Sequence, residues 1–388
     1  MSLNPVIDML GRRLRLAVIG GGTGSFIGAM HRQSARRDDR YQIVTGIFSS
    51  DPAKSKKDAS ELGFESDRIY SSVKELYEKE SSRKDGIDAV AIMTPNDSHF
   101  DYSMWALERG IDVICDKPMT NTLAEAEALH KKVQETGLVF CLTHNYTGYP
   151  MVRQAKAMVE AGDLGTIRLV QVEYVQGGKA DENKVFPAGY WKFDPARGGP
   201  SLVMGDIGSH AHNLTRFITG LEIDEVSAEI GTIVPNRLVH DIGGAMLRFN
   251  NGARGSFWVT QAAAGGENCL RIRESGTKGS LEWMQEIPQA LTFKPLNAPS
   301  QNRTPNGPGT LPLSARCTRL VAGHPEGFPD GFANIYSDAA EAIAARRAGK
   351  QADPLALYFP NSFDGLMGMR FVDSVIASSD ANGQWTKC

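Results

Sequence analysis

Residues 14–31 read LRLAVIGGGTGSFIGAMH, and glycine occupies five of the nine positions from Gly20 to Gly28. The mostly apolar residues 14–19 are predicted to form a buried parallel strand, and residues 26–37 are predicted to form a helix. A strand, a glycine-rich turn and a helix in this order begin a Rossmann unit, because glycines let a pyrophosphate approach the backbone at the helix N-terminus. A tight turn without a ligand is the alternative. We favour a dinucleotide-binding loop because the turn directly follows the strand.

These glycines match the G-x-G-x-x-G pattern imperfectly. Gly20 and Gly22 take its first two positions, but Ser25 stands at the third. We therefore expect Gly24 and Gly28 to supply the close packing of the helix. The residues expected to contact the cofactor in this loop are Gly20, Gly22, Thr23, Gly24, Ser25 and Phe26.

The end of the second predicted strand, residues 42–48, bears on the choice between NAD and NADP. An acidic residue there favours NAD, whereas small residues near a cation admit NADP. This chain has Ser49 and Ser50, then Asp51 about two positions late, and Lys54. Asp51 can equally be the N-cap of a following helix. We expect NAD as the cofactor, with NADP left open, and cofactor contacts from Ser49, Ser50 and Lys54.

Three further strands alternate with helices, at residues 89–93, 112–115 and 139–142. Repeated strand–helix alternation with short turns indicates a doubly wound parallel sheet. The ligand of such a sheet lies beyond the carboxyl ends of its strands. Polar clusters follow these three strands, at residues 94–99, 116–118 and 143–146.

The bulk properties restrict the class of protein. A chain of 388 residues is longer than one hydrophobic core usually serves, so two domains are expected. A net charge of −3 gives no electrostatic basis for binding nucleic acid or an anionic membrane. No apolar run approaches the roughly 20 residues of a membrane span. The five cysteines are scattered, without C-x-x-C spacing, which fits free thiols in a reducing cytoplasm.

The second half of the chain reads as a different fold class. Residues 1–145 are expected to form the Rossmann domain. Residues 146–388 are expected to form an α+β domain for substrate binding and oligomerisation, whose C-terminal helix packs back on the first domain. Strand-like segments between residues 166 and 294 predict a large, mainly antiparallel open sheet with one helical face. Residues 295–314, rich in Pro, Asn and Gly, are expected to form a long loop.

Two polar motifs carry candidate chemistry. In the stretch at residues 116–118, Lys117 can stabilise a developing alkoxide, although a lone lysine after a strand is more often a solvated loop residue. Asp206 and His210 stand four residues apart, so on a helix they share one face. There a carboxylate orients an imidazole and raises its basicity.

The loop before the second motif offers sugar contacts. Trp191 can stack on the apolar face of a sugar, and Lys192 and Arg197 can donate to hydroxyl groups. A surface loop with one buried tryptophan is the alternative. No metal site is predicted, because the spacing of His144, His210 and His212 is poor and no cysteine pair assists them.

Together these motifs resemble the Gfo/Idh/MocA family, named for glucose–fructose oxidoreductase and inositol dehydrogenase. That family has a glycine-rich first turn, a T-P-N-x-x-H stretch, an E-K-P stretch and a later D-x-G-x-H. The corresponding segments here are residues 20–28, 94–99, 116–118 and 206–210. The resemblance continues through residues 241–253 and 276–281, and Asp116 replaces the usual Glu. Residues 323–327 and 332–336 look like a subgroup that includes levoglucosan dehydrogenase.

The resemblance implies an NAD(P)-dependent dehydrogenase acting on a sugar, glycoside or cyclitol. It implies that Lys117 holds the reacting hydroxyl, that His210 takes its proton, and that Asp206 binds a neighbouring hydroxyl or orients the catalytic groups. It also implies a homodimer or homotetramer. Further implied cofactor contacts are Thr94, Pro95, Asn96, His99, Asp116, Lys117, His144 and Asn145. The implied substrate contacts are Lys117, Tyr146, Trp191, Lys192, Arg197, Asp206 and His210.

Two other classes of protein stay open. A glycosidase of the same fold oxidises the sugar ring transiently, so that the glycosidic bond can eliminate without net formation of NADH. A sensor that has lost the catalytic pair is the third class, and the presence of Lys117, Asp206 and His210 argues against it.

Overall fold

The computed structural model describes residues 3–186 and 189–388, and the chain folds into two compact units. The first unit contains the residues up to Thr120, then Ala124–Asn145 and Phe332–Leu366. The second contains Asn121–Leu123, Tyr146–Gly331 and Met367–Cys388. Each unit has its own sheet.

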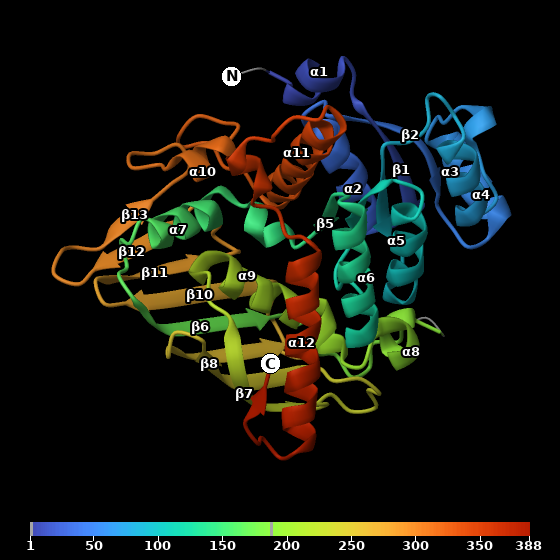
Figure 1. Cartoon of the computed structure of the whole chain (residues 1–388). Coiled ribbons are helices and arrows are strands. Elements are labelled where there is room, and N and C mark those ends of the chain that lie inside the picture. The colour runs from blue at the N-terminus through green and yellow to red at the C-terminus, as the bar shows by residue number, and fades with distance from the viewer. Residues whose placement is uncertain (1–2, 187–188) are drawn as a thin grey trace. The chain divides into compact units, whose positions relative to one another are not determined.

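The first unit is built on a five-stranded parallel sheet in the order β2-β1-β3-β4-β5 (Figure 1). The chain runs from β1 outward to β2 and then continues on the other side of β1, which creates a topological switch point where ligands of such sheets bind. The predicted doubly wound parallel sheet is confirmed. Its strands are β1 (Leu14–Gly20), β2 (Tyr41–Ile47), β3 (Ala89–Met93), β4 (Asp112–Cys115) and β5 (Phe140–Leu142).

Helices and short 3-10 turns connect these strands. Asp51 is the N-cap of α3 (Pro52–Glu61), and Pro52 at the first position of this helix has the fixed φ that a helix start requires. The connecting elements are α1 (Pro5–Leu10), α2 (Phe26–Arg37), α3 (Pro52–Glu61), η1 (Ser66–Arg68), α4 (Val73–Ser81), η2 (Asn96–Ser98), α5 (His99–Leu107) and α6 (Leu123–Thr136).

A segment from late in the chain, Phe332–Leu366, belongs to the first unit. This differs from our expectation that residues 146–388 form one domain. The reason is the polar and aromatic contact made by α11 (Phe328–Arg347). The Tyr336 hydroxyl lies 2.6 Å from Nδ1 of the buried His31. The Tyr41 hydroxyl donates to the Tyr336 carbonyl at 3.0 Å. The short turn η6 (Pro354–Leu357) completes this segment.

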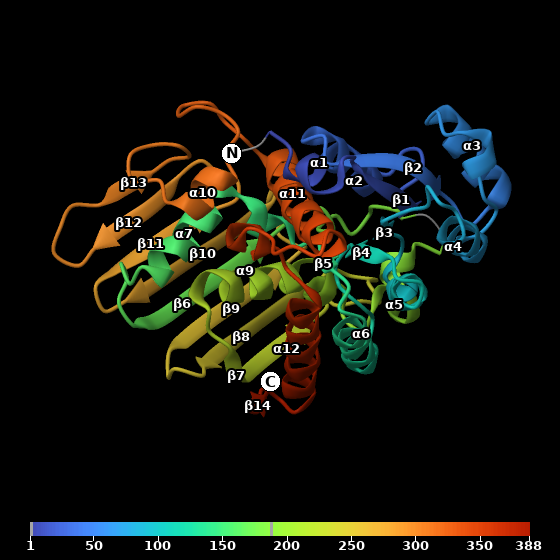
Figure 2. The same ribbon diagram turned by 45° about the horizontal axis from the view of Figure 1, so that its top comes forward.

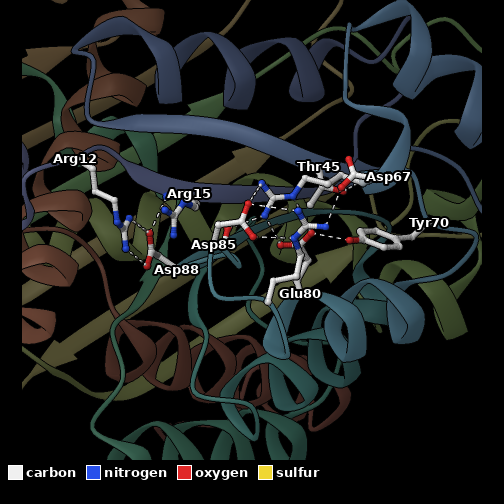
Figure 3. A network of polar contacts seen from close by, with 10 residues as sticks. Arg12, Arg15, Thr45, Asp67, Tyr70, Glu80, Asp85 and Asp88 are labelled. Carbon is white, nitrogen blue, oxygen red and sulfur yellow. Dashed lines mark hydrogen bonds and ion pairs between the residues drawn. The ribbon is translucent and has the colours of Figure 1, made fainter.

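A charged cluster holds the amino ends of the central strands (Figure 3). Asp88, just before β3, accepts hydrogen bonds from two nitrogens of Arg12 at 2.6 and 3.0 Å. It also accepts the backbone N–H of Arg15 at 2.8 Å. Nearby, Glu80 of α4 accepts from Tyr70 at 2.7 Å. Asp88 thus holds the strands together at their amino ends. Ligands of such sheets bind at the opposite, carboxyl ends of the strands.

The second unit is built on a nine-stranded sheet in the order β13-β12-β11-β10-β6-β9-β8-β7-β14. β6 and β9 pair in parallel, and the other described pairs are antiparallel, so the predicted mainly antiparallel sheet is confirmed. The strands are β6 (Ile167–Val175), β7 (Ile223–Gly231), β8 (Ile242–Phe249), β9 (Arg254–Thr260), β10 (Cys269–Gly276), β11 (Gly279–Met284), β12 (Leu291–Pro295), β13 (Gln301–Arg303) and β14 (Thr386–Lys387).

Helices cover one face of this sheet and leave the other open (Figures 1 and 2). The covering helices are α7 (Pro150–Glu160), α9 (Ser209–Thr219) and α12 (Ser362–Asp380). Side chains alternate accordingly along β8, where Leu247 is buried under the helices and Met246 is 54% exposed on the open face. Apolar burial under the helices stabilises the second unit.

The expectation of a long loop over residues 295–314 was partly wrong. This stretch contains β13, which pairs with β12, and ends in α10 (Pro312–Arg316). The residues of β13 are Gln-Asn-Arg, which have no apolar alternation. Backbone pairing at the sheet edge creates this strand, and composition does not reveal it. Within residues 3–186 and 189–388, no helix has the length and apolarity needed to span a membrane.

Glu274 is an exception in the helix-covered core of the second unit. It is 1% exposed, and neither of its carboxylate oxygens has a hydrogen-bond partner among the residues that the structure describes. Its neighbours across the sheet are Val170 on β6 and Leu281 on β11. Burial raises the pKa of Glu274 to about 8, while Lys156 acts in the opposite direction. Glu274 is therefore protonated in the folded protein at neutral pH.

We predict that this carboxyl group makes the protein less stable as the pH rises. The unfolded chain loses the Glu274 proton near the ordinary pKa, whereas the folded chain keeps it to about pH 8. The free energy of unfolding therefore falls by about 1.4 kcal/mol per pH unit from this group across that window. Between pH 6 and pH 8, Glu274→Gln should gain about 2–3 kcal/mol relative to the unmodified protein. Urea unfolding at both pH values measures this gain.

Glu229→Gln, at an exposed position of β7, is the control for removing a carboxylate. It should behave like the unmodified protein at both pH values. Equal stability differences for Glu274→Gln at pH 6 and pH 8 would contradict the predicted titration of Glu274.

Candidate functional site

Close backbone contacts shape the glycine loop between β1 and α2. A Cβ on Gly28 would lie 2.2 Å from the carbonyl oxygen of Gly21, so only glycine lets α2 approach the loop. Gly20 and Gly24 have φ values of +89° and +84°, which L side chains rarely adopt. Nothing lies within 4 Å of a Cβ at Gly24, so our expectation that Gly24 packs against the helix was wrong. Its glycine serves the backbone conformation, whereas Gly28 serves the packing.

Two polar side chains hold this loop. The Ser25 hydroxyl caps α2 by accepting the N–H of Gly28 at 3.1 Å. The N–H and hydroxyl of Thr23 donate to the two oxygens of Asp58 at 3.1 and 2.7 Å. Hydrogen bonds from Thr23 lower the pKa of Asp58, which favours its ionised form. Sequence reasoning missed Asp58, because it lies on α3, 35 residues beyond Thr23, and no motif marks it.

The residues after β2 form the cap of α3. The Asp51 carboxylate accepts the N–H groups of Ala53 and Lys54 at 2.8 and 3.3 Å. The Ser49 hydroxyl accepts the N–H of Asp51 at 3.2 Å. Of the two readings that the sequence left open for Asp51, the structure shows the helix cap. Ser49, Ser50 and Lys54 lie at this carboxyl end of β2.

The loops after β3 and β4 are joined by one buried imidazole. His99 is 1% exposed, and its ring nitrogens lie 2.8 Å from the Pro118 carbonyl and 3.0 Å from the Thr94 carbonyl. Pro95 precedes the turn that contains the buried Asn96. His99 thus holds together two loops that follow neighbouring parallel strands.

Lys117 lies in the second of these loops. Asp116 before it accepts the Lys117 N–H at 2.9 Å and the Thr143 hydroxyl at 3.1 Å. The shorter carboxylate at the family's Glu position is therefore engaged with the backbone and with the loop after β5. The Lys117 side chain is partly exposed.

The loop after β5 carries His144 and Asn145, both 3% exposed. Within the described part of the chain, the buried side-chain amide nitrogen of Asn145 has no hydrogen-bond partner. A buried donor of this kind is normally satisfied, so it marks a position where a ligand can accept a hydrogen bond. The tight glycine loop, the switch point and this donor all fit a dinucleotide at the carboxyl edge of the sheet.

The second unit contains the other candidate groups. Asp206 lies in a π-helical turn, η5 (Met204–Gly208), and not in the regular helix that its spacing from His210 suggested. Such turns occur often at functional sites. The Asp206 carboxylate accepts from Lys192 Nζ at 2.9 Å and from Gln261 Nε2 at 2.9 Å. Lys179 Nζ lies 3.6 Å from it. The sequence carried no signal for Lys179 or Gln261.

His210 lies in the first turn of α9 and is 7% exposed. Its ring packs edge-on against Tyr146, with 4.8 Å between centroids. The Tyr146 and Tyr174 hydroxyl oxygens lie 2.5 Å apart. Burial raises the pKa of both phenols, so both carry their protons at neutral pH. His212 stacks on Phe371, with 4.5 Å between centroids, and so belongs to the core.

The predicted sugar-binding loop forms η4 (Trp191–Phe193) and α8 (Pro195–Gly198). From this loop Lys192 reaches Asp206, and its ammonium group also lies 5.6 Å from the centroid of the Trp191 ring. Arg197 is partly exposed on α8. The structure therefore brings Asp206, His210, Tyr146 and Lys192 together in the second unit, while Lys117 belongs to the first.

Comparisons with known proteins agree with both halves of this description. Residues 14–144 match the family model described as "Oxidoreductase family, NAD-binding Rossmann fold", and residues 152–282 match the "GFO/IDH/MocA C-terminal domain". An oxidoreductase structure from Sinorhizobium meliloti is 46% identical, with a TM-score of 0.88, over 97% of this chain and 100% of that one.

Two similar proteins are named for a sugar or were solved with a cyclitol. An inositol dehydrogenase homolog from Azotobacter vinelandii, solved with NADH and myo-inositol, is 32% identical with a TM-score of 0.91 over 98% of this chain and 99% of that one. Levoglucosan dehydrogenase of Pseudarthrobacter phenanthrenivorans is 31% identical over 224 residues, which cover 52% of this chain and 56% of that enzyme.

We predict that Gly28→Ala weakens NAD binding by about tenfold or more, because the new methyl group pushes α2 away from the loop. Calorimetric titration with NAD measures the change. Gly327→Ala is the matched control, since nothing lies within 4 Å of a Cβ there and its φ is not positive. Unchanged NAD affinity in a folded Gly28→Ala variant would contradict the assignment of this loop to the cofactor.

Proposed function

Because the chain belongs to the Gfo/Idh/MocA family of oxidoreductases, with an NAD-binding Rossmann domain, we propose that it transfers a hydride between NAD and a hydroxyl-bearing carbon of a sugar, glycoside or cyclitol. The observation that supports this most is the arrangement around Asp206 and His210. A carboxylate held by two lysines and an imidazole held by tyrosines suit the binding and deprotonation of a polyol.

The first unit holds the cofactor in this proposal. Gly20, Gly22, Thr23, Gly24, Ser25 and Phe26 would hold the pyrophosphate, and Thr94, Pro95, Asn96 and His99 would supply further contacts to the dinucleotide. Asp116, His144 and Asn145 lie toward the nicotinamide, where the unpaired amide of Asn145 can donate. Bound NAD supplies the hydride acceptor in the direction of oxidation.

The choice between NAD and NADP rests on the end of β2. Ser49 stands where an acid would bind the ribose, and Asp51 is engaged as a helix cap. We propose NAD, because a relative of nearly equal length was solved with NADH, and we keep NADP as a second cofactor. Ser49, Ser50 and Lys54 are the residues that contact the adenosine ribose in either case.

In the proposed reaction, Lys117 donates a hydrogen bond to the reacting hydroxyl and stabilises the oxyanion that develops there. His210 accepts the hydroxyl proton as the general base. Asp206 binds a neighbouring hydroxyl, and Lys192 helps to orient it. The reduction of a ketone runs through the same groups in reverse.

The remaining substrate contacts come from the second unit. Trp191 gives an apolar surface for the hydrophobic face of a pyranose or an inositol ring. Lys192 and Arg197 donate to hydroxyl groups, and Tyr146 forms the wall behind His210. These contacts suit an uncharged polyol.

We further propose that the protein is a homodimer or homotetramer that pairs through the open face of the nine-stranded sheet. That face exposes Leu169, Met246 and Trp258, with exposed fractions of 55, 54 and 46%. A hollow of about 160 Å³ lies beside Trp258 and is bordered by Arg271 and Arg273. Large apolar side chains on one sheet face favour association. The five free cysteines support a cytoplasmic location.

Replacing Lys117 or His210 by Ala should lower kcat/KM by about 10²–10⁴-fold, since each variant loses a group that acts on the reacting hydroxyl. The affinity for NAD should stay within about threefold, because neither side chain is needed to bind the pyrophosphate. Lys350→Ala and His324→Ala, at exposed positions, are the matched controls and should retain full turnover. Full turnover in both site variants would rule out this mechanism.

The substrate class can be tested by following NADH absorbance with NAD or NADP and a panel of glycosides, anhydrosugars and inositols. We expect growth of the NADH signal with at least one polyol, because the site offers a base and several hydroxyl partners. Glycoside cleavage without net NADH would instead identify the redox-assisted glycosidase. Cofactor binding with no turnover on any compound would favour a sensor.

A further inference from the structure

A continuous chain of side-chain hydrogen bonds runs through the second unit from Asp206 to Tyr146. Gln261 Nε2 donates to Asp206 at 2.9 Å and to Gln176 Oε1 at 3.2 Å. Gln176 Nε2 donates to Asn268 Oδ1 at 2.6 Å. The chain thus leaves Asp206 and crosses the ends of three neighbouring strands.

At its far end the chain reaches the wall of His210. The Tyr174 hydroxyl donates to Asn268 Oδ1 at 2.8 Å, and Asn268 Nδ2 donates to the Tyr146 hydroxyl at 3.3 Å. The Tyr146 ring packs against His210. The two ends of the chain therefore touch the two polar residues of the D-x-G-x-H motif.

The backbone around this chain is firmly held. The four residues between Asp206 and Tyr146 come from β6 or from positions directly after β6 and β9 and before β10, and β6 pairs with both other strands. The Gln176 N–H donates to the Thr260 carbonyl at 2.8 Å, and the Ala263 N–H donates to the Gln176 carbonyl at 3.1 Å. A Cβ on Gly177 would lie 2.3 Å from the Ala263 carbonyl oxygen. The polar chain is thus supported by a closely packed loop.

Lys179 and Asp206 together determine the direction of this chain of hydrogen bonds. The Lys179 ammonium group, which can only donate, lies 2.6 Å from Gln261 Oε1, and the Asp206 carboxylate, which can only accept, faces Gln261 Nε2. The amide oxygen of Gln261 must therefore face Lys179, and the amide nitrogen must face Asp206. A reversed amide would put an oxygen against the Asp206 carboxylate.

The orientation of the Gln261 amide then fixes which atoms donate and which accept in the rest of the hydrogen-bond chain. Gln176 accepts through its oxygen and donates through its nitrogen, so Asn268 must accept through its own oxygen. The single proton of Tyr174 goes to that oxygen, so the Tyr146 hydroxyl donates to Tyr174. The Lys179–Asp206 pair thus orders five side chains, which are those of Gln261, Gln176, Asn268, Tyr174 and Tyr146.

We propose that Lys179 is a positioning residue for Asp206 and His210. It fixes the Gln261 amide that holds Asp206, and through the polar chain it fixes the Tyr146 ring that supports His210. This assignment rests on the proposed function, in which Asp206 and His210 act on the substrate.

Charge gives Lys179 a second effect. The charged and titratable groups around Asp206 include Lys179 after β6, Lys192 on η4, Tyr146 and Tyr174, with His210 four residues further along the chain. Removing one cation from this group raises the pKa of a neighbouring carboxylate or imidazole. A residue that served only folding would leave these titrations unchanged.

The test compares Lys179→Met, Lys179→Arg and the control Lys184→Met, each assayed on the polyol identified by the substrate panel. Lys184 belongs to the same excursion after β6, is exposed, and donates to the Gly178 carbonyl. We expect Lys179→Met to lower kcat by about tenfold or more with NAD affinity unchanged. The acidic limb of its pH profile should move to higher pH. Lys179→Arg should restore most of kcat, and Lys184→Met should match the unmodified protein.

A second measurement does not depend on turnover. The His210 imidazole is titrated by NMR in the unmodified protein and in Lys179→Met, with the signal identified by its loss in His210→Ala. We expect its midpoint to move to higher pH in Lys179→Met. An unmoved midpoint in a folded variant overturns the proposal, whatever the activity. An inactive unmodified protein whose midpoint moves as expected instead sets aside the proposed reaction and keeps the positioning role.

Discussion

The first unit depends on the close approach of two glycines. A Cβ on Gly21 or on Gly28 would collide with the backbone of the other, so the bare backbones let α2 begin directly beyond the end of β1. The N-terminus of the helix then lies at the end of β1, and helix N-termini in this position bind a pyrophosphate in Rossmann units. Asp58 holds the same loop through Thr23. Asp88 holds the sheet together at the amino ends of its strands. The ligand of such a sheet lies at the opposite, carboxyl ends.

In the second unit, the main constraint is that the carboxylate of Asp206 lies in a mostly buried place. The Asp206 side chain is 18% exposed, and an unpaired charge there would be costly. Two lysines and the Gln261 amide compensate the charge of Asp206. Glu274 shows the other outcome, because its oxygens have no partners and it keeps its proton.

The division of the chain into units does not follow the order of the sequence. The segment Phe332–Leu366 joins the first unit because Tyr336 contacts His31 and Tyr41. Tyr336 lies roughly 300 residues from its two partners in the chain. No local pattern therefore predicts this contact.

Local sequence patterns predict the strand–glycine–helix start, the parallel strands of the first sheet, the mainly antiparallel second sheet and the motifs around Lys117, Asp206 and His210. These features follow from local periodicity and from the special backbone freedom of glycine. Only the tertiary structure shows that Asp58 holds the glycine loop and that Lys179 and Gln261 hold Asp206. It also shows that Gly24 serves the backbone conformation and not the packing of α2. The physical reason is that each of these roles depends on a contact between residues distant in the chain, and such contacts form only when strands and helices pack.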